Sequence, residues 1–327
     1  MNNKVNILYT CDNAYLPLTS ISMASVIANN QSSDICFYIA TETEDNDNFK
    51  YLLNFYKDKT NIEIKYLDAK KYDNLLNKNN LDKWGSNSYY VYWKLFAYDN
   101  LDVDYIWYLD SDVLCLSKIN NPKLMENKSV GGTLDTAHYT FNKVAHINEN
   151  YYFYNTGALF VDVKKWKDNG NTSKVINYIE NLKYKPLMCD QDFLAIALQE
   201  DIEVLNPKYN YLIGYDYYGV HNVFEMYSLN KKPFYKEKEI EDAKDEVIFY
   251  HYLGGVFGRP WQKGNYCPRK EEFNKYRELS AWPKFESKFN KSILFRFEGA
   301  LEFLPKTIYN KIHNFAMTKY LERLGKQ

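Results

Sequence analysis

The chain has 327 residues, enough for one large domain or two ordinary ones and enough to bury a core without disulfide or metal staples. Lys and Arg (41) nearly balance Asp and Glu (42), and this net charge of −1 argues against broad, salt-driven nucleic-acid binding. The five cysteines are scattered and form no CxxC pair, which indicates reduced thiols and argues against a cysteine-based zinc site.

The N-terminal stretch MNNKVNILYT contains no apolar region of the length that a signal peptide needs. Elsewhere, no run approaches the roughly 18 uncharged apolar residues of a membrane span. We therefore expect a cytoplasmic protein without a transmembrane helix.

Strand-like and helix-like segments alternate along the first 67 residues. Short apolar runs predict the strands, and apolar residues at helical spacing predict the helices. The predicted strands are 5–9, 35–40 and 62–67, and the predicted helices are 16–30 and 45–57. Such alternation predicts an α/β fold with a mostly parallel, Rossmann-like sheet and right-handed crossovers.

The middle of the chain continues this pattern with longer interruptions. Residues 68–88 are polar and Asn-rich and are predicted to form a surface segment. The following predicted elements are a helix at 89–101, strands at 104–110, 131–135 and 156–163, and helices at 173–183 and 191–199. The irregular, charged segment 215–245 is predicted to be a mobile lid, and 247–254 a last strand of the same sheet.

From about residue 270 the chain becomes helical in pattern, rich in Lys and aromatic residues. Residues 284–327 carry nine Lys and Arg against four Glu, about +5, which leaves about −6 for the rest because the whole chain is −1. We divide the chain into a main domain, 1–268, and a helical, basic and aromatic C-terminal region, 269–327. This region is predicted to contact a membrane surface, the alternative being ordinary packing on the main domain.

Two carboxylates, Asp110 and Asp112, follow the buried run YIWYL, with Ser111 between them. Ligands of open α/β sheets bind beyond the carboxyl ends of strands. Side chains two apart on an extended segment point the same way, and two adjacent carboxylates repel unless a cation joins them. The motif therefore predicts a site for a hard divalent cation such as Mn²⁺ or Mg²⁺; the alternative is a capped turn.

This D-x-D pattern occurs in nucleotide-sugar glycosyltransferases and in aspartyl-phosphate phosphatases. The phosphatases carry Thr or Val two residues after the second Asp, usually on the first strand. Here that residue is Leu114, and three predicted strands precede the motif. The pattern favours the transferase.

Several stretches then resemble glycosyltransferase family 8, which comprises retaining enzymes of the GT-A fold, including bacterial lipopolysaccharide and lipooligosaccharide transferases and glycogenin. The stretches occur in the family's order and span residues 7–261. They are ILYTCDNAYLPLTSISMASV, YWKL, YLDSDVL, YNTGALFVDVKKW, CDQDFLAIAL and HYLGG…RPW. D-x-D alone is weak evidence, but D-x-D followed by N-x-G, D-Q-D and H-Y-x-G…P-W is specific.

The resemblance implies a metal site and a nucleotide site. His251 would join Asp110 and Asp112 around Mn²⁺, with Mg²⁺ as the alternative. The uridine would lie after the first strand, where Asp12 would accept from the uracil N–H and Tyr15 would stack on the ring. An Asx turn is the alternative role for this loop. The uridine residues are Thr10, Asp12, Asn13 and Tyr15.

The resemblance also implies cations for the diphosphate. Lys94 stands where the family often has Arg, so it keeps the charge but loses bidentate geometry. Gly254, followed by a second glycine, would let the backbone approach the phosphates. Arg259 matches the family's Lys before Pro-Trp and would neutralise the leaving phosphate, with Lys263 as the spare candidate.

The sugar-binding residues follow from the N-T-G and D-Q-D stretches. Asn155 and Asp190 would bind the donor sugar, and Gln191 would lie near its anomeric carbon. Asp192 is the nearest ionised group if the reaction uses a covalent intermediate, and D-Q-D can equally cap the helix that follows. Asp135 resembles an acceptor-binding position.

Together these stretches imply an Mn²⁺-dependent hexosyltransferase. It would move glucose or galactose from a UDP-sugar to a glycan, lipid-linked or protein-linked acceptor, with retention at the anomeric carbon, by same-face attack or by double displacement. It would be cytoplasmic, with peripheral contact on the inner face of the cell membrane through the C-terminal region, and would not bind nucleic acid. A non-catalytic nucleotide-sugar or glycan-binding module is the main alternative.

Overall fold

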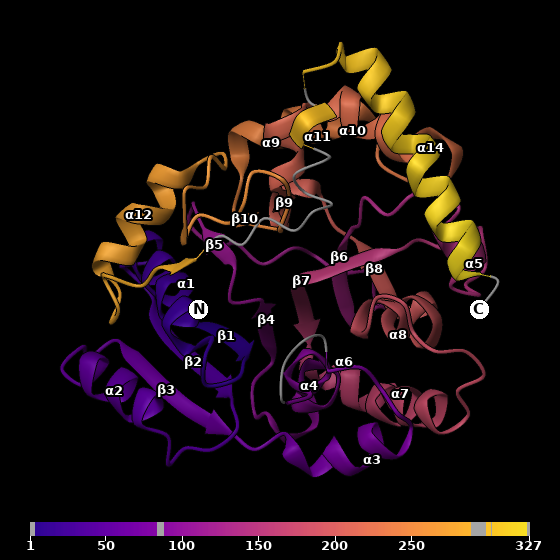
Figure 1. Ribbon diagram of the computed structural model, residues 1–327. Coiled ribbons are helices and arrows are strands. Elements are labelled where there is room, and N and C mark those ends of the chain that lie inside the picture. The colour runs from indigo at the N-terminus through magenta and orange to yellow at the C-terminus, as the bar shows by residue number, and fades with distance from the viewer. Residues whose placement is uncertain (1–3, 84–87, 289–298, 302, 326–327) are drawn as a thin grey trace.

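The computed structural model describes residues 4–83, 88–288, 299–301 and 303–325, and a seven-stranded sheet forms its centre (Figure 1). Its strands are β1 (Lys4–Thr10), β2 (Asp34–Ala40), β3 (Ile62–Leu67), β4 (Tyr105–Leu109), β6 (Val130–Leu134), β7 (Tyr154–Asp162) and β8 (Ile202–Val204). They lie in the order β3-β2-β1-β4-β7-β6-β8. All neighbours pair in parallel except β7, which runs antiparallel to β4 and to β6. The predicted α/β, mostly parallel sheet is confirmed.

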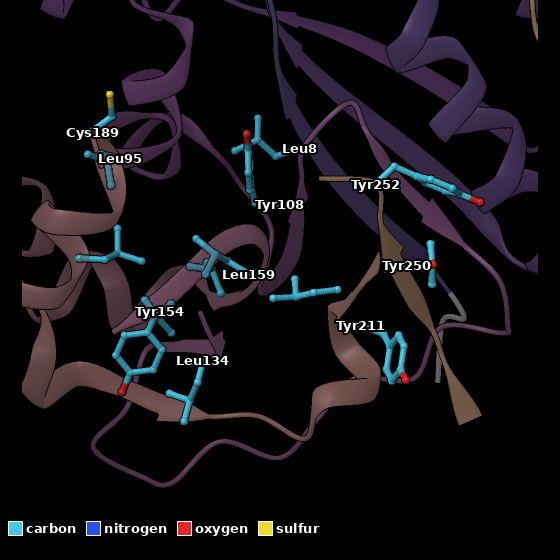
Figure 2. Packing of buried hydrophobic residues seen from close by; sticks show 14 of the residues in the cluster. Leu8, Leu95, Tyr108, Leu134, Tyr154, Leu159, Cys189, Tyr211, Tyr250 and Tyr252 are labelled. Atoms are coloured by element: carbon cyan, nitrogen blue, oxygen red, sulfur yellow. The ribbon is translucent and has the colours of Figure 1, made fainter. Parts of the chain in front are cut away.

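The central strands are buried on both faces, and this explains their unbroken apolar runs. Successive residues of a strand point to opposite faces. On β1, Leu8 accordingly belongs to one core cluster and Ile7 to the other. Figure 2 shows Leu8 in the first cluster with Tyr108 of β4 and Leu159 of β7. The sheet therefore separates two cores.

Helices cover both faces (Figure 1). They are α1 (Leu16–Asn29), α2 (Asp47–Tyr56), α3 (Asp73–Lys78), α4 (Tyr90–Ala97), α5 (Phe141–Val144), α6 (Val163–Asp168), α7 (Asn171–Glu180) and α8 (Asp190–Ala197). Helices α4, α6 and α8 contribute Trp93, Trp166 and Phe193 to the cluster that contains Leu8, whereas Met23 of α1 and Leu52 of α2 belong to the other. The predicted surface segment 68–88 contains the short helix α3, and its residues 84–87 lie outside the described residues.

A second sheet carries part of the site. Its strands are β5 (Val113–Cys115), β10 (Phe249–His251) and β9 (Tyr211–Leu212), in the order β5-β10-β9. The prediction that 247–254 adds a strand to the main sheet is wrong, because β10 pairs with β5 instead. In this pairing His251 lies opposite Val113, and the register therefore brings His251 beside Asp112.

The prediction that 215–245 is irregular is also wrong, while its role as a mobile lid stays a prediction. This segment forms α9 (Ile213–Tyr218), α10 (Val220–Tyr227) and α11 (Glu237–Ala243), whose apolar residues are buried. Phe224 and Ile240 join the main core, and most charged side chains of these helices are exposed. The side chain of Asp216, in contrast, is only 9% exposed and pairs with Lys244 and Arg269. The segment is thus a packed layer over the second sheet.

The C-terminal region is helical where it is described, and residues 289–298 lie outside the described part. Helix α12 (Lys270–Leu279) packs on α1, and β11 (Gln262–Lys263) pairs with β12 (Ser287–Lys288). Helix α14 (Lys306–Leu324) lies along α10 at the upper right of Figure 1. Among the described residues, none of the helices combines the length and apolarity needed to span a bilayer. The division at residue 268 stays a prediction.

Candidate active site

A cavity of about 350 Å³ lies at the carboxyl ends of β1 and β4, where the alternating pattern placed the site. Most of the predicted site residues line it. They are Thr10, Tyr15, Lys94, Asp110, Ser111, Asp112, Asp135, Asn155, Asp190, Gln191, His251, Gly254 and Arg259. The predicted residues Asp12, Asn13, Asp192 and Lys263 are not among its lining residues. We call this space the donor cavity.

Three of these side chains form a group with the geometry of a metal site. Asp110 and Asp112 lie in the turn between β4 and β5, and His251 ends β10. One ligand atom from each lies within 4.8 Å of the others. Two carboxylates and an imidazole suit Mn²⁺.

The hydrogen bonds of His251 leave its outer nitrogen available as a ligand. Its Nδ1 lies 3.1 Å from Oδ1 of Asn155 and 3.1 Å from Oδ1 of Asn210. The Asn155 atom is an oxygen, since it also accepts from the backbone N–H of Gly157 at 3.0 Å. Nδ1 therefore carries a proton, and Nε2, which lies 3.3 Å from Oδ1 of Asp112, would serve as a metal ligand in its deprotonated form.

A glycine beside His251 makes this placement possible. A Cβ atom on Gly157 would lie 2.1 Å from Cε1 of His251 and 2.5 Å from its Nδ1. Since Gly157 sits on the buried strand β7, the ring would have to move if any side chain were present.

Lys94, on α4, links two carboxylates from different parts of the site. Its Nζ lies 3.2 Å from Asp110 and 2.9 Å from Asp190, and its side chain is 3% exposed. Burial alone would lower the pKa of Lys94, but the two carboxylates outweigh it and raise the pKa. Burial raises the pKa of Asp190, and Lys94 opposes that shift. Thr156 also donates to Asp190, at 2.5 Å. The ammonium is thus a fixed internal counter-ion.

Arg259 is the second cation and pairs with Asp112. Burial would raise the pKa of Asp112, but His251 and Arg259 hold it well below its usual range. A Cβ atom on Gly254 would lie 3.3 Å from Nε of Arg259, so the glycine leaves room for the guanidinium. Lys263, the spare candidate, is exposed and pairs with Glu286 instead.

The D-Q-D stretch begins α8, and its residues point in different directions. Gln191 Nε2 lies 3.4 Å from Oδ2 of Asp135, which also accepts from Asn155 at 2.7 Å. Asp192 instead accepts from the backbone N–H groups of Leu187 and Met188, and burial raises its pKa to about 6. Asp192 therefore fixes the turn before α8.

The residue before this helix, Cys189, has φ of 49° and ψ of −121°, a conformation that L-residues rarely adopt. Such strain costs about 1–3 kcal/mol and persists only where the surroundings impose it. It lies directly before Asp190 and Gln191, which both line the donor cavity. The strained turn thus sets the direction in which α8 enters the site.

Of the four predicted uridine-binding residues, Thr10 and Tyr15 line the donor cavity, and Asp12 and Asn13 do not. The ring of Tyr15 lies against that of Tyr90, with centroids 5.9 Å apart, and both line the donor cavity. Asp12 accepts from the backbone N–H of Tyr15 at 3.0 Å, which is the alternative Asx turn. The backbone N–H of Asn13 donates to Glu42 at 2.8 Å.

Comparison with known proteins agrees with this geometry. The family model described as Glycosyl transferase family 8 matches residues 6–264, most of the chain. The chain belongs to glycosyltransferase family 8. The predicted family resemblance is thereby confirmed, and the phosphatase alternative has no support.

Two curated relatives of this family 8 chain act on lipopolysaccharide by name. A lipopolysaccharide 1,2-glucosyltransferase of Escherichia coli is 24% identical over 85% of this chain and 79% of the relative. A lipopolysaccharide 1,3-galactosyltransferase of Salmonella typhimurium LT2 is 23% identical over 86% of this chain and 80% of the relative. The crystal structure of the galactosyltransferase LgtC with donor and acceptor sugar analogs superposes with a TM-score of 0.67 at 17% identity, covering 90% of this chain and 99% of LgtC. This likeness shows the GT-A fold.

Sequence reasoning missed several residues of the family 8 site. Asn210 orients His251 but precedes a two-residue strand and belongs to none of the quoted stretches. Thr156 and Gly157 stand in the quoted N-T-G stretch, and their roles were open to inference there. Tyr90, in the cavity wall, carried no signal beyond its place before YWKL.

Proposed function

We propose that this family 8 glycosyltransferase moves glucose or galactose from a UDP-sugar to a glycan or a lipid-linked or protein-linked acceptor, with retention at the anomeric carbon. The observation that carries the proposal is the group of Asp110, Asp112 and His251 at the donor cavity. The same cavity holds Lys94 and Arg259, so it offers ligands for a cation and cations for a diphosphate.

Asp110, Asp112 and Nε2 of His251 would hold Mn²⁺, with Mg²⁺ as the alternative. Their fit rests on the donor set and on the protonated Nδ1, which leaves Nε2 as a ligand. When bound, such an ion supplies Lewis-acid stabilisation of charge on the diphosphate oxygens.

The donor cavity offers suitable side chains for the uracil, the phosphate and the sugar of a UDP-sugar. Tyr15 and Tyr90 offer aromatic faces for the uracil ring. Arg259 would neutralise the departing phosphate, and its position beside Asp112, a ligand of the proposed cation, supports this role. Asp190, held by Lys94 and Thr156, can accept hydrogen bonds from sugar hydroxyls.

The arrangement of α8 favours same-face attack. Gln191 lines the cavity, and an amide is a poor nucleophile, whereas Asp192 is turned into the preceding loop. In the proposed step the bond from the anomeric carbon to phosphate breaks, and its electron pair stays on the phosphate oxygen. The acceptor oxygen then bonds to the anomeric carbon from the same face and gives its proton to that phosphate oxygen. The transition state resembles an oxocarbenium ion.

The exposed side chains of α14 support a lipid-linked acceptor, because they suit contact with a membrane. Four apolar or aromatic side chains are exposed there, namely Ile308, Ile312, Phe315 and Tyr320. Lys and Arg residues accompany them on the helix. Such a surface suits the interface of an anionic membrane.

Turnover of UDP-glucose and UDP-galactose with Mn²⁺ tests the proposal. We expect slow release of UDP without acceptor, and Asp110→Asn should lower this release at least about 100-fold, since it removes one anionic ligand. Circular dichroism and a melting curve control for folding. Binding of UDP-sugar without any turnover would instead establish the binding module, and undiminished release by Asp110→Asn would refute the metal role.

A further inference from the structure

A second cavity, of about 220 Å³, adjoins the donor cavity. Leu253 and Gly254 line both spaces, so one short piece of backbone after β10 separates them. Thr136 lines the second cavity, and its neighbour Asp135 lines the donor cavity. A ligand in the second cavity would therefore lie within reach of a donor sugar.

The two cavities differ in chemistry. The donor cavity contains four aspartates, a lysine and an arginine among its lining residues. Among the described residues that line the second cavity, none is Asp, Glu, Lys or Arg. Three aromatic residues line it instead, Tyr218, Tyr227 and Phe257. Aromatic faces and a few hydroxyl and backbone groups suit the apolar face and the hydroxyls of an uncharged sugar, whereas a diphosphate would find no cation.

The C-terminal helix completes this second cavity. His313 of α14 is one of its lining residues, and its ring meets that of Tyr227 edge-on with centroids 5.1 Å apart. The helix is held there by polar contacts on both sides of His313: Asn310 donates to Asn222 at 2.8 Å and Asn314 to Ser228 at 2.7 Å. The placement of His313 is thus fixed by α10.

We propose that the second cavity binds an uncharged sugar unit of the acceptor, and that His313 is an acceptor-specificity residue supplied by the C-terminal helix. This inference rests on the proposed function, because the acceptor is defined by transfer from the donor cavity. It gives α14 a role inside the site, independent of any contact of its outer face with a membrane.

Gly214, in the first turn of α9, allows the cavity to be filled without disturbing the donor side. It lines the second cavity, and a Cβ atom there would meet nothing within 4 Å. Gly214→Leu should occupy the space that the sugar would take, and Gly214→Ala is the matched control because a single methyl group leaves most of it open. His313→Ala removes the α14 side chain, with Thr307→Ala, an exposed position on the same helix, as its control.

The measurement is saturation-transfer NMR on the full chain with UDP and Mn²⁺, using methyl glucosides, methyl galactosides, lactose and maltose as probes and glucose 6-phosphate as the charged comparator. We expect at least one neutral probe to bind. Gly214→Leu should weaken that binding at least about tenfold and His313→Ala about three- to tenfold, by the lost contacts of one buried side chain. Both controls should bind as the wild type does, and the affinity for UDP should stay within about twofold in all variants.

The inference is overturned if no neutral probe binds the wild type, if Gly214→Leu binds the probe unchanged, or if glucose 6-phosphate binds as well as the neutral sugars. Loss of UDP affinity in Gly214→Leu would also overturn it, since the two cavities would then not be separate sites. The proposed function fails in a different way, by absence of UDP-sugar turnover in the wild type.

Discussion

The two cavities that share Gly254 differ in the charge of the residues that line them. In the donor cavity, Asp110 and Asp190 share Lys94, and Asp112 pairs with Arg259. The second cavity has aromatic walls and no charged side chain among its described lining residues. Under the proposed function, charge is concentrated where the bond to phosphate would break, and the second cavity would need only shape and hydrogen bonding to hold an acceptor hydroxyl group.

We expect the largest effect from removing Lys94, the cation that Asp110 and Asp190 share in the donor cavity. Lys94→Met leaves the buried carboxylate of Asp190 and the partly exposed carboxylate of Asp110 without their counter-ion, and breaking a buried pair such as Lys94–Asp190 costs about 3–5 kcal/mol. We expect a lower melting temperature and a fall in UDP-sugar turnover of about 100-fold or more. Lys94→Arg keeps the charge and should recover part of both. Turnover within about threefold of wild type in Lys94→Met would show that the pair is dispensable.

A substitution with a smaller expected effect tests whether His251 binds the metal ion together with Asp110 and Asp112. In Gly157→Ala the new methyl group displaces the ring of His251, and disturbing a ligand's support typically costs 10- to 100-fold in metal affinity. We expect a loss of about that size in Mn²⁺ affinity by calorimetry. Gly132→Ala is the matched control on β6, because the nearest atom to its methyl group would be the end of the Leu159 side chain, at 3.2 Å. Its other two neighbours, Tyr154 and Ile202, lie at ordinary contact distances of 3.4 and 3.8 Å. Equal Mn²⁺ affinity in the two variants would argue against His251 as a ligand.

The next prediction concerns the exposed face of α14, the helix whose His313 lines the second cavity. Phe315 is 65% exposed, and burying such a ring in a lipid interface is worth about 1–2 kcal/mol. Phe315→Glu should therefore reduce co-sedimentation with anionic vesicles about five- to tenfold and leave turnover with a water-soluble acceptor unchanged. Tyr105→Glu alters an exposed ring on β4 and is the control. Salt-insensitive solubility and no vesicle binding by the wild type would favour simple packing of the tail.

We expect the smallest effect from Asp192, which is not among the lining residues of the donor cavity, and this effect is on stability. Burial raises the pKa of Asp192 to about 6, above its value in an unfolded chain, so the native state prefers the protonated form. Its contribution to stability is complete below about pH 4 and is lost as the pH rises to about 6. Asp192→Asn, which can accept the same two backbone hydrogen bonds, should remove this loss and be more stable at pH 7 by up to about 3 kcal/mol. Melting curves of both proteins from pH 4 to pH 8 check the sign, and a constant difference would contradict it.

Much of the main sheet could be predicted because its strands are buried on both faces and leave long apolar runs. Helices α9 to α11 were missed because each has only six to eight residues, too few to show a helical period among many charges. The apolar run at 247–254 does form a strand, but its partner is β5, and no local pattern records that choice. The role of Asn210 could not be predicted for the same reason, because it contacts His251, 41 residues away in the sequence, only in the folded chain.

One buried amide, that of Asn155, lies in the wall of the donor cavity. The oxygen of Asn155 accepts from Gly157 and, at 2.7 Å, from Asn210, and it faces Nδ1 of His251, while its nitrogen donates to Asp135. A single planar group therefore orients both the ring of His251 and the carboxylate of Asp135. Because these dipoles are already aligned by the folded backbone, little reorganisation remains for the moment of reaction. Any change that tilts this plane should disturb His251 and Asp135 together, so under the proposed function adaptation to a new acceptor would be more accessible at the walls of the second cavity than at Asn155.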